Sequence, residues 1–174
     1  SETFTVIVLS VNDAPVLASV SDISFDEDGS ISISLSASDI DNVELEFSIS
    51  GGSNVSATLS GSDVSFSAPA DYNGSEIFTI TVTDGELSDS QNITVTVNAV
   101  NDAPVLSSIG DQELSEDGTL NILLSAFDVE GDVLEYSVEG GANISVSLSG
   151  SELVFAPAQD FNGSETFTVT VSDG

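Results

Sequence analysis

Pairs of acidic side chains two residues apart occur at equivalent places in the two halves of this sequence. Asp39 and Asp41 form the pair in "DIDN", and Asp128 and Glu130 form it in "DVEGD". Two carboxylates at positions i and i+2 of a loop project toward one point, and such hard oxygen donors suit Ca²⁺. We therefore take these pairs as candidate calcium ligands.

An Asn-Asp dipeptide precedes each pair and offers further oxygen donors. The stretch "VNDAPVL" occurs twice, and its dipeptides are Asn12-Asp13 and Asn101-Asp102. About one hairpin separates each dipeptide from its acidic pair, so the pair can fold back onto it. Asp84 and Asp173, each ending an expected strand, are placed at the same end. Together these groups supply the roughly six to eight oxygens that Ca²⁺ takes.

The charge of the chain excludes several classes of function. It carries 30 acidic residues, no Lys, Arg or His, and a formal net charge of −30. Without basic side chains the surface cannot neutralise phosphates, which argues against nucleic-acid binding and against anionic membranes. Catalysis is disfavoured too, because nucleophile–base pairs depend on His, Cys or Lys. Only carboxylates, hydroxyls and amides remain, and we expect no enzyme.

The same charge must be balanced, because like charges repel in a compact state. One interpretation is a salty environment in which monovalent cations screen the surface. The other is divalent cations bound at discrete places. Composition alone leaves both open.

The sequence lacks an apolar run of membrane-spanning length, and it lacks methionine. No apolar run approaches the length of about 18 residues that would span a membrane, so no membrane insertion is expected. The chain also contains no Met. We therefore expect either a processed product or a window on something longer.

Internal repetition is the strongest signal in the sequence. Asn12 recurs as Asn101, an offset of 89 residues, and "EDG", Gly-Gly and "LSGS" recur at the same offset, as does "DYNGSE" in the form "DFNGSE". Within each copy, apolar residues alternate with Ser and Thr, which indicates half-buried antiparallel strands. In the first copy these runs begin at Ile31, Val43, Asp63, Glu76 and Asn92.

This pattern predicts an all-β protein made of tandem Greek-key β-sandwiches with about seven strands each. The expected boundaries are residues 12–100 for the first repeat and 101–174 for the second. Residues 1–11 read as the last strand of a preceding or neighbouring repeat, because they run straight into "NDAP" as the run from Asn92 does. The second copy stops before its own last strand.

Two explanations fit these ends. The chain is a window on a longer tandem array, or residues 1–11 of one copy complete the open sandwich of the next. The second arrangement would be strand addition at an exposed sheet edge, giving a head-to-tail filament.

The motifs "VNDAPVL", "EDG", "DYNGSE" and "TVTDG", in the same order in both copies, resemble the bacterial cadherin-like tandem repeats (tandem-95 type) of large calcium-dependent surface adhesins. The resemblance covers essentially the whole chain. It implies extracellular sandwiches, cadherin-like or Ig-like, joined end to end with Ca²⁺ held between neighbours. For the middle junction it implies ligands Glu27, Asp71, Asn101, Asp102, Asp128, Glu130 and Asp173, and for the N-terminal edge Asn12, Asp13, Asp39, Asp41 and Asp84.

Two functions follow as expectations. The first is a calcium-stiffened extender module of a long extracellular or cell-surface protein, whose partners are neighbouring repeats and whose parent carries any adhesive surface ligand elsewhere. The second is a subunit of a self-assembling extracellular filament, in which copies of the chain join head to tail by donating strand 1–11.

Overall fold

The computed structural model describes residues 1–174 and contains strands but no helix. The chain therefore has no helix long and apolar enough to cross a membrane. It divides into two compact units, Ser1–Val100 and Asn101–Gly174, which are described separately.

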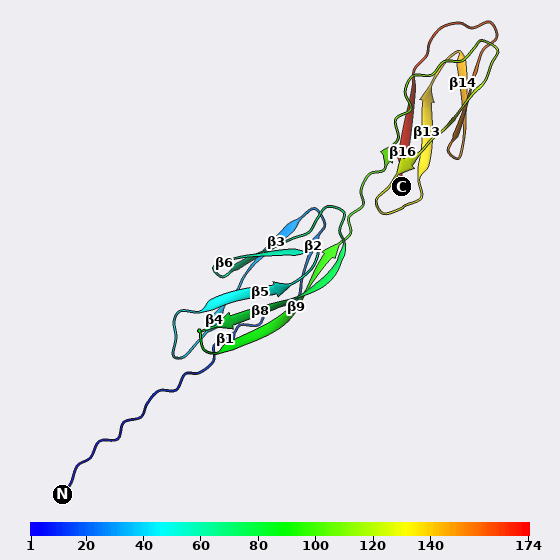
Figure 1. Cartoon of the computed structure of the whole chain (residues 1–174). Coiled ribbons are helices and arrows are strands. Elements are labelled where there is room, and N and C mark those ends of the chain that lie inside the picture. The colour runs from blue at the N-terminus through cyan, green and yellow to red at the C-terminus, as the bar shows by residue number, and fades with distance from the viewer. The chain divides into compact units, whose positions relative to one another are not determined.

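Two facing sheets and a short strand pair make up the first unit (Figure 1). The larger sheet has the order β2 (Ile23–Asp26), β9 (Ser88–Asn98), β8 (Gly74–Thr83), β5 (Glu46–Gly51), and the smaller has β3 (Ser30–Ser34), β7 (Asp63–Ser67), β6 (Ser56–Ser60). The pair is β1 (Val16–Leu17) with β4 (Ala37–Ser38). Strand β2 runs parallel to β9, and the other pairs are antiparallel. Because β5 lies beside β8 and not beside β6, the connections cross between sheets, as in a Greek key.

The alternation of apolar and hydroxyl residues decides which face of each strand is buried. On β8, Phe78, Ile80 and Val82 are fully covered while the threonines between them reach the outer face. Phe66 on β7 meets Phe78 edge to face, with ring centroids 5.2 Å apart and an angle of 79°. Such pairs stabilise a core beyond the area they bury, so the two sheets are held together at their centre.

The predicted all-β fold class is confirmed, and one strand boundary is corrected. Alternation placed Val43 at the start of a strand, but β5 begins at Glu46 and Val43 is 99% exposed. The chain at this point is still in the loop that carries Asp39 and Asp41, and that loop must leave the sheet to reach Asp13.

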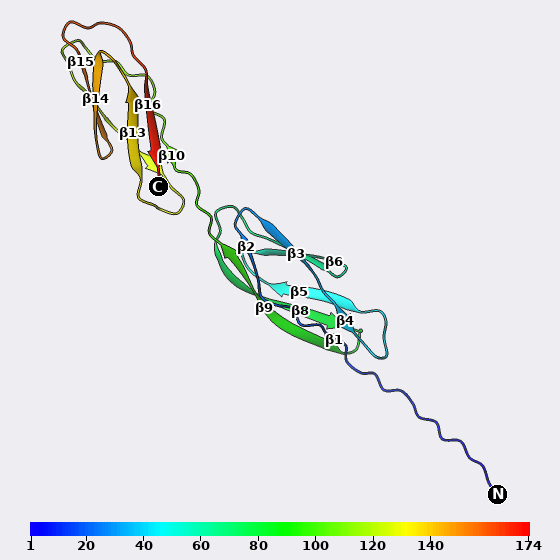
Figure 2. The same ribbon diagram turned by 180° about the vertical axis from the view of Figure 1, so that it is seen from behind.

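The second unit repeats this plan with fewer strands (Figure 2). Its sheets are β11 (Leu120–Leu123), β15 (Glu152–Pro157), β14 (Ile144–Ser149) and β13 (Glu135–Gly140), β16 (Phe167–Ser172), with the short pair β10 (Val105–Leu106) and β12 (Ala126–Phe127). Residues 112–115, at the place of β2, form no strand, and the described residues end before the place of β9. Leu124, Leu153 and Phe155 form its buried core, far fewer residues than in the first unit.

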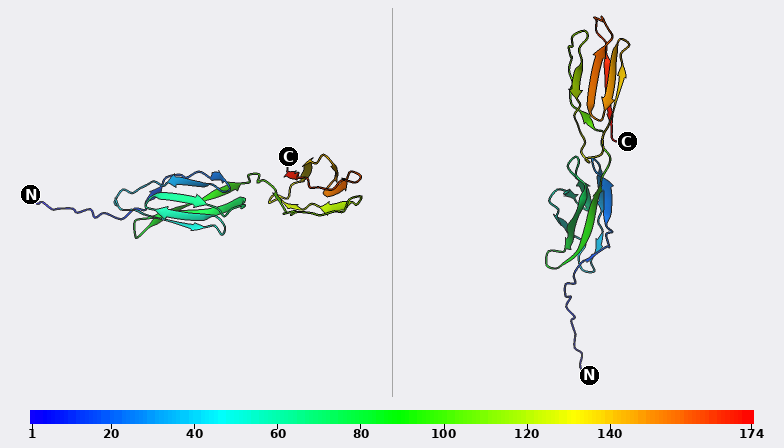
Figure 3. Two further views of the ribbon diagram at one scale, coloured as in Figure 1. Left: turned by 90° about the horizontal axis from the view of Figure 1, so that it is seen from above. Right: turned by 90° about the vertical axis from the view of Figure 1, so that its right-hand side faces the viewer.

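Residues 1–15 form no strand and pair with none. Both views in Figure 3 show this segment leaving the first sandwich with no strand beside it. Its apolar side chains are exposed, with Phe4 at 86%, Val6 at 72% and Val8 at 90%.

A carboxylate holds the loop between β5 and β6 in place. The side chain of Glu76 accepts hydrogen bonds from the backbone N–H groups of residues 53–55, at 2.9–3.3 Å. Strand β5 ends before this loop at Gly51, whose φ is 118° and where a Cβ would collide with the carbonyl oxygen of Ile77. The second unit repeats the device, with Glu165 accepting from residues 142–144.

Burial raises the pKa of Glu76, but these hydrogen bonds outweigh it and lower the pKa from 4.5 to about 2. The pKa of Glu165 is likewise lowered to about 2, above all by the backbone N–H of Ile144. Both carboxylates therefore stay ionised well below the pH at which an ordinary glutamate is protonated.

Candidate metal-binding sites

Three loops of the first unit meet around Asn12 and Asp13. The amide of Asn12 donates to Oδ2 of Asp84 at 2.8 Å, and the backbone N–H of Asp13 donates to Oδ2 of Asp41 at 2.9 Å. Asp84 lies just after β8, and Asp41 lies between β4 and β5. The structure thus brings together four residues that the sequence analysis grouped.

The loop that follows β4 is organised by its own first carboxylate. Oδ1 of Asp39 accepts from the backbone N–H groups of Asp41 and Asn42, both at 2.7 Å. Oδ2 of Asp39 is covered and has no hydrogen-bond partner. Asn42, which sequence reasoning missed, donates to Oδ1 of Asn12 at 2.9 Å. One oxygen of Asp39 thus shapes the loop and the other is left for a ligand.

Asp84 stays ionised in this arrangement. The backbone N–H of Leu87, the amide of Asn12 and the backbone N–H of Glu86 donate to its carboxylate and lower its pKa below the usual range.

The second unit has the same arrangement at its own Asn-Asp dipeptide. Asn101 donates to Oδ2 of Asp173 at 2.7 Å, and the backbone N–H of Asp102 donates to Oε2 of Glu130 at 3.3 Å. Asp128 is only 7% exposed. Its Oδ1 accepts from the backbone N–H of Asp132 at 3.0 Å, while its Oδ2 is covered and unpartnered.

A third acidic group lies near the last residues of the first unit. Glu27 is 4% exposed, and its Oε1 accepts from the backbone N–H of Val100 at 2.6 Å. Its Oε2 is covered and has no partner. Carboxylate oxygens of Asp28 and Asp71 lie within 4.8 Å of each other. Asp28 was interpreted from sequence only as a turn residue. Glu116, the counterpart of Glu27, is exposed.

Asp28 and Asp71 both have positive φ, at 62° and 58°. This left-handed conformation is tolerated by Asp, Asn and Gly and is costly for β-branched side chains. We expect Asp28→Val to lower the free energy of unfolding of the first unit by about 1–2 kcal/mol, with Asp28→Asn close to the parent. Urea denaturation followed at Tyr72 in a Tyr136→Phe background measures both, and equal losses would contradict a backbone origin.

The covered oxygens of Asp39, Asp128 and Glu27 pose one physical problem. A buried charge is strongly disfavoured unless it is paired or coordinates a metal. The chain has no Lys, Arg or His to pair with them. Carboxylate and amide oxygens are the ligands that Ca²⁺ prefers, whereas softer metals prefer Cys or His side chains. The residues present therefore fit a hard divalent cation.

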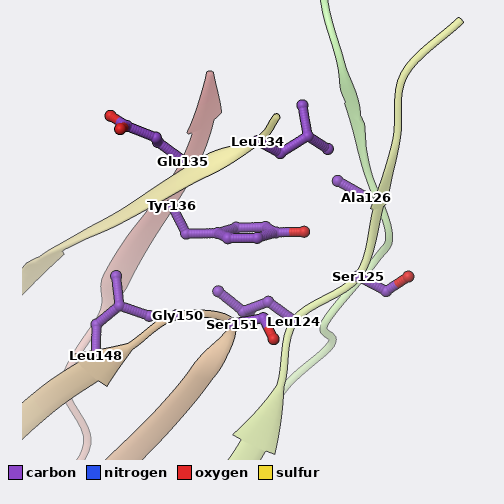
Figure 4. Close-up of a pocket in the computed structure, with 9 residues that line it drawn as sticks. All are labelled: Leu124, Ser125, Ala126, Leu134, Glu135, Tyr136, Leu148, Gly150 and Ser151. Carbon is purple, nitrogen blue, oxygen red and sulfur yellow. The ribbon is translucent and has the colours of Figure 1, made fainter. Parts of the chain in front are cut away.

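A hollow in the second unit gathers no such groups. It has a volume of about 730 Å³ and is lined by residues at β12, at the start of β13, and at the end of β14 with the turn that follows it. Figure 4 shows the ring of Tyr136 across its middle and the carboxylate of Glu135 directed away from it. No nucleophile faces a general base here, so the acidic loop clusters remain the candidate sites.

The paired sheets, the repeated plan and the acidic loops define a tandem of Ig-like β-sandwiches. The chain belongs to the bacterial Ig domain family, whose model matches residues 12–96 and 101–174.

The chain is similar in sequence to a bacterial protein and in fold to solved structures. Chitinase A of Pseudoalteromonas piscicida is 30% identical over 171 residues, covering 94% of this chain and 20% of that protein. The chain thus spans about a fifth of that relative's length. Human protocadherin-24 EC1-2 gives a TM-score of 0.59 in its form II at 18% identity, covering 92% of this chain and 95% of that one. A second structure of the same fragment gives 0.53 at 19% identity, covering 93% and 94%.

Proposed function

We propose that the chain is a non-catalytic structural module of a long extracellular or cell-surface protein, of the adhesin extender type, in which Ca²⁺ stiffens the joints between sandwiches. The observation that carries the proposal is the set of covered, unpartnered carboxylate oxygens on Asp39, Asp128 and Glu27 in a chain without basic side chains. The finer resemblance to tandem-95 adhesin repeats belongs to this proposal as well.

Ca²⁺ would be held at the dipeptide end of each unit by that unit's loop carboxylates. In the first unit these are the residues around Asn12, with Asp13, Asp39, Asp41 and Asp84. In the second they are Asn101, Asp102, Asp128, Glu130 and Asp173. When bound, the ion supplies positive charge that neutralises the cluster, and it is coordinated by oxygens from several loops at once.

The chain's own residues link these groups to the joint. Glu27 holds the N–H of Val100, and the next residue, Asn101, holds Asp173. An acidic group of each unit is thus anchored to one of two adjacent residues of the chain. Without a cation the like charges within each acidic cluster repel. With a bound cation the residues that connect the two units would lose conformational freedom.

Two measurements test this proposal. Calorimetric titration of the chelator-treated chain should show Ca²⁺ binding, with dissociation constants no weaker than about 10⁻³ M, as for extracellular modules. Small-angle scattering should show a larger and narrower distribution of dimensions with Ca²⁺ than with chelator. An unchanged maximum dimension would contradict the proposed stiffening by Ca²⁺. An absence of binding heat would contradict the proposed calcium sites.

The competing explanation of the charge is screening by monovalent cations. A KCl series at matched ionic strength separates the two. If KCl reproduced the whole change in dimensions, the ion at the joint would be unnecessary.

A second function is favoured by a different observation. The outer edge of β16 has no paired strand, and the segment of residues 1–11 is unpaired and exposes its apolar side chains. Copies of the chain that joined at these two places would form a head-to-tail extracellular filament.

A further inference from the structure

The outer face of the sheet β3, β7, β6 in the first unit is covered by hydroxyl groups. Ser32 and Ser65 share a hydrogen bond at 2.7 Å, and Ser34 donates to Oδ1 of Asp63 at 2.5 Å. Both contacts join residues that lie directly opposite each other on β3 and β7, and such cross-strand pairs stabilise a sheet. This face is therefore polar, and its side chains satisfy one another.

The same face of the second unit is apolar at equivalent places. Three exposed serines of the first unit are replaced 89 residues later, Ser34 by Leu123, Ser38 by Phe127 and Ser65 by Val154.

These replacements are turned toward water. Leu123 is 76% exposed, and Phe127 is 68% exposed. Val105, which lies opposite Phe127, is 67% exposed. Val154 is half-buried and faces outward, because Leu153 and Phe155 on either side of it point into the core. We call Val105, Leu123, Phe127 and Val154 the apolar stripe.

The exposure of the apolar stripe belongs to the face itself. The sheet has the same three strands in both units, with the same short strand pair beside it. In the first unit, too, the equivalent side chains are exposed, so no strand of the sandwich covers this face.

The apolar stripe brings the second unit no internal contact in exchange. Leu123 lies opposite Glu152 and cannot donate to it as Ser34 donates to Asp63. Glu152 accepts instead from the amide of Asn121 at 3.3 Å. Single exposed apolar residues are ordinary on a surface, but a group of them on one face marks an interaction site.

Charge and area decide what can cover this face. The chain carries a net charge of −30 and no Lys or Arg, so a second copy of it is repelled. Even an aromatic side chain buries at most about 250 Å², so the partly exposed apolar stripe falls short of the roughly 800 Å² per partner in a stable protein complex. A narrow partner with positive charge fits both limits.

We propose that the apolar stripe of the second unit binds an extended segment of another protein, apolar on the face that meets Leu123 and Phe127 and rich in Lys or Arg elsewhere. Leu123 and Phe127 lie four residues apart on one strand, about 13 Å, which a short extended segment spans. Glu152 beside Leu123 supplies a carboxylate for a basic side chain. This site lies on a sheet face and is independent of whether the acidic loops bind Ca²⁺.

Two peptides of equal charge separate apolar docking from electrostatic attraction. One alternates Lys with Leu and the other alternates Lys with Ser, and each is titrated into the full chain in the presence of chelator. Because alternate side chains of an extended peptide share a face, only the Lys–Leu peptide offers an apolar face. It should bind the parent more tightly than the Lys–Ser peptide does.

The variant with Leu123→Ser, Phe127→Ser and Val154→Ser should bind the Lys–Leu peptide at least about tenfold more weakly than the parent. Its affinity for the Lys–Ser peptide should be unchanged. The first unit has serine at all three positions in the same fold, so the variant should keep its strands, which far-ultraviolet circular dichroism verifies. Val16→Ser, which removes a 61% exposed apolar side chain from the first unit, is the matched control and should bind as the parent does.

Salt gives a second distinction. Near 1 M NaCl the Debye length falls to about 3 Å, so the Lys–Ser peptide should dissociate. The Lys–Leu peptide should still discriminate between the parent and the triple variant, since burial of apolar surface does not depend on charge.

A fluorophore locates the bound peptide in a chain that has no cysteine of its own. Ser147 is exposed and lies opposite Val154, and its counterpart Thr58 lies opposite Ser65. A label on Ser147→Cys should respond to the Lys–Leu peptide, and a label on Thr58→Cys should not. Equal responses at the two positions, or equal affinity of the parent and the triple variant, would overturn the proposal. A parent that sediments as a dimer while the triple variant is a monomer would also overturn it, because the apolar stripe would then bind a second copy.

Discussion

Ca²⁺ at one hundred times its dissociation constant is expected to raise the free energy of unfolding of the unit that binds it by about 2.7 kcal/mol. For a domain of this size, the thermal midpoint should then rise by about 10–20 °C. The physical reason is that the folded unit gathers the acidic loop oxygens and the unfolded chain does not. Calorimetric scans with Ca²⁺ and with chelator measure the difference.

Asp128→Asn should change sign between these two conditions. With chelator, the substitution removes a buried charge whose Oδ2 has no partner, so the second unit should become more stable than the parent. With Ca²⁺, the variant loses a ligand and should be less stable than the parent. Asp39→Asn should behave in the same way in the first unit.

Glu139→Gln is the matched control, since this carboxylate is exposed on β13 opposite Thr168, toward the end of the strand that lies away from Asp173. It should gain as much from Ca²⁺ as the parent does. The chain has two tyrosines and no tryptophan. Because Tyr72 lies in the first unit and Tyr136 in the second, near-ultraviolet circular dichroism follows one unit at a time in Tyr136→Phe and Tyr72→Phe backgrounds, each of which keeps a single tyrosine. Equal stabilisation of Asp128→Asn and the parent would remove that carboxylate from the site.

Period-two alternation was sufficient to predict most of the fold. Four of the runs lie in observed strands, those from Ile31, Asp63, Glu76 and Asn92 in β3, β7, β8 and β9. Successive side chains of a strand point to opposite faces, so a strand with one buried face has an apolar residue at every second position. The two-residue strands β1 and β4 could not be predicted this way, since two residues carry no period. Val43 was misplaced because an apolar residue in a loop looks the same as one in a strand.

The acidic loops were predictable only where both repeats share a residue. The i, i+2 pairs and the Asn-Asp dipeptides were grouped from sequence, and the structure places them in contact; their role as ligands stays a prediction. Asn42 was missed because its counterpart is Gly131, so repetition gave no signal. Asp28 was missed because a turn explains it equally well, and only its distance to Asp71 suggests more.

The repeated Glu of "NGSE" carried a signal whose meaning needed the structure. Its hydrogen-bond donors lie 21–23 residues upstream of Glu76, and no local pattern connects the two segments. The fold brings them together because β5 pairs with β8, with Gly51 opposite Phe78.

Glu76→Gln is expected to destabilise the first unit strongly at neutral pH. A carboxylate can accept several N–H groups at once, and the amide replaces one of its oxygens by a donor. Some of the backbone N–H groups of residues 53–55 would then lose their charged partner, and bonds to charged acceptors are the stronger ones. We expect the thermal midpoint of the first unit to fall by about 5–15 °C, while the transition reported by Tyr136 stays in place.

The difference between the parent and Glu76→Gln should depend on pH in a defined direction. The pKa of Glu76 is lowered on folding from 4.5 to about 2, so its stabilisation is complete above pH 4.5 and is lost as the pH falls toward 2. Protonation of the other carboxylates relieves repulsion in both proteins and largely cancels in the difference. Midpoints of the two proteins should therefore converge between pH 4.5 and pH 2. Tyr72→Phe, which removes only the weak 3.3 Å bond to Glu76, should show no such convergence, and a constant gap for Glu76→Gln would assign its effect to packing instead of charge.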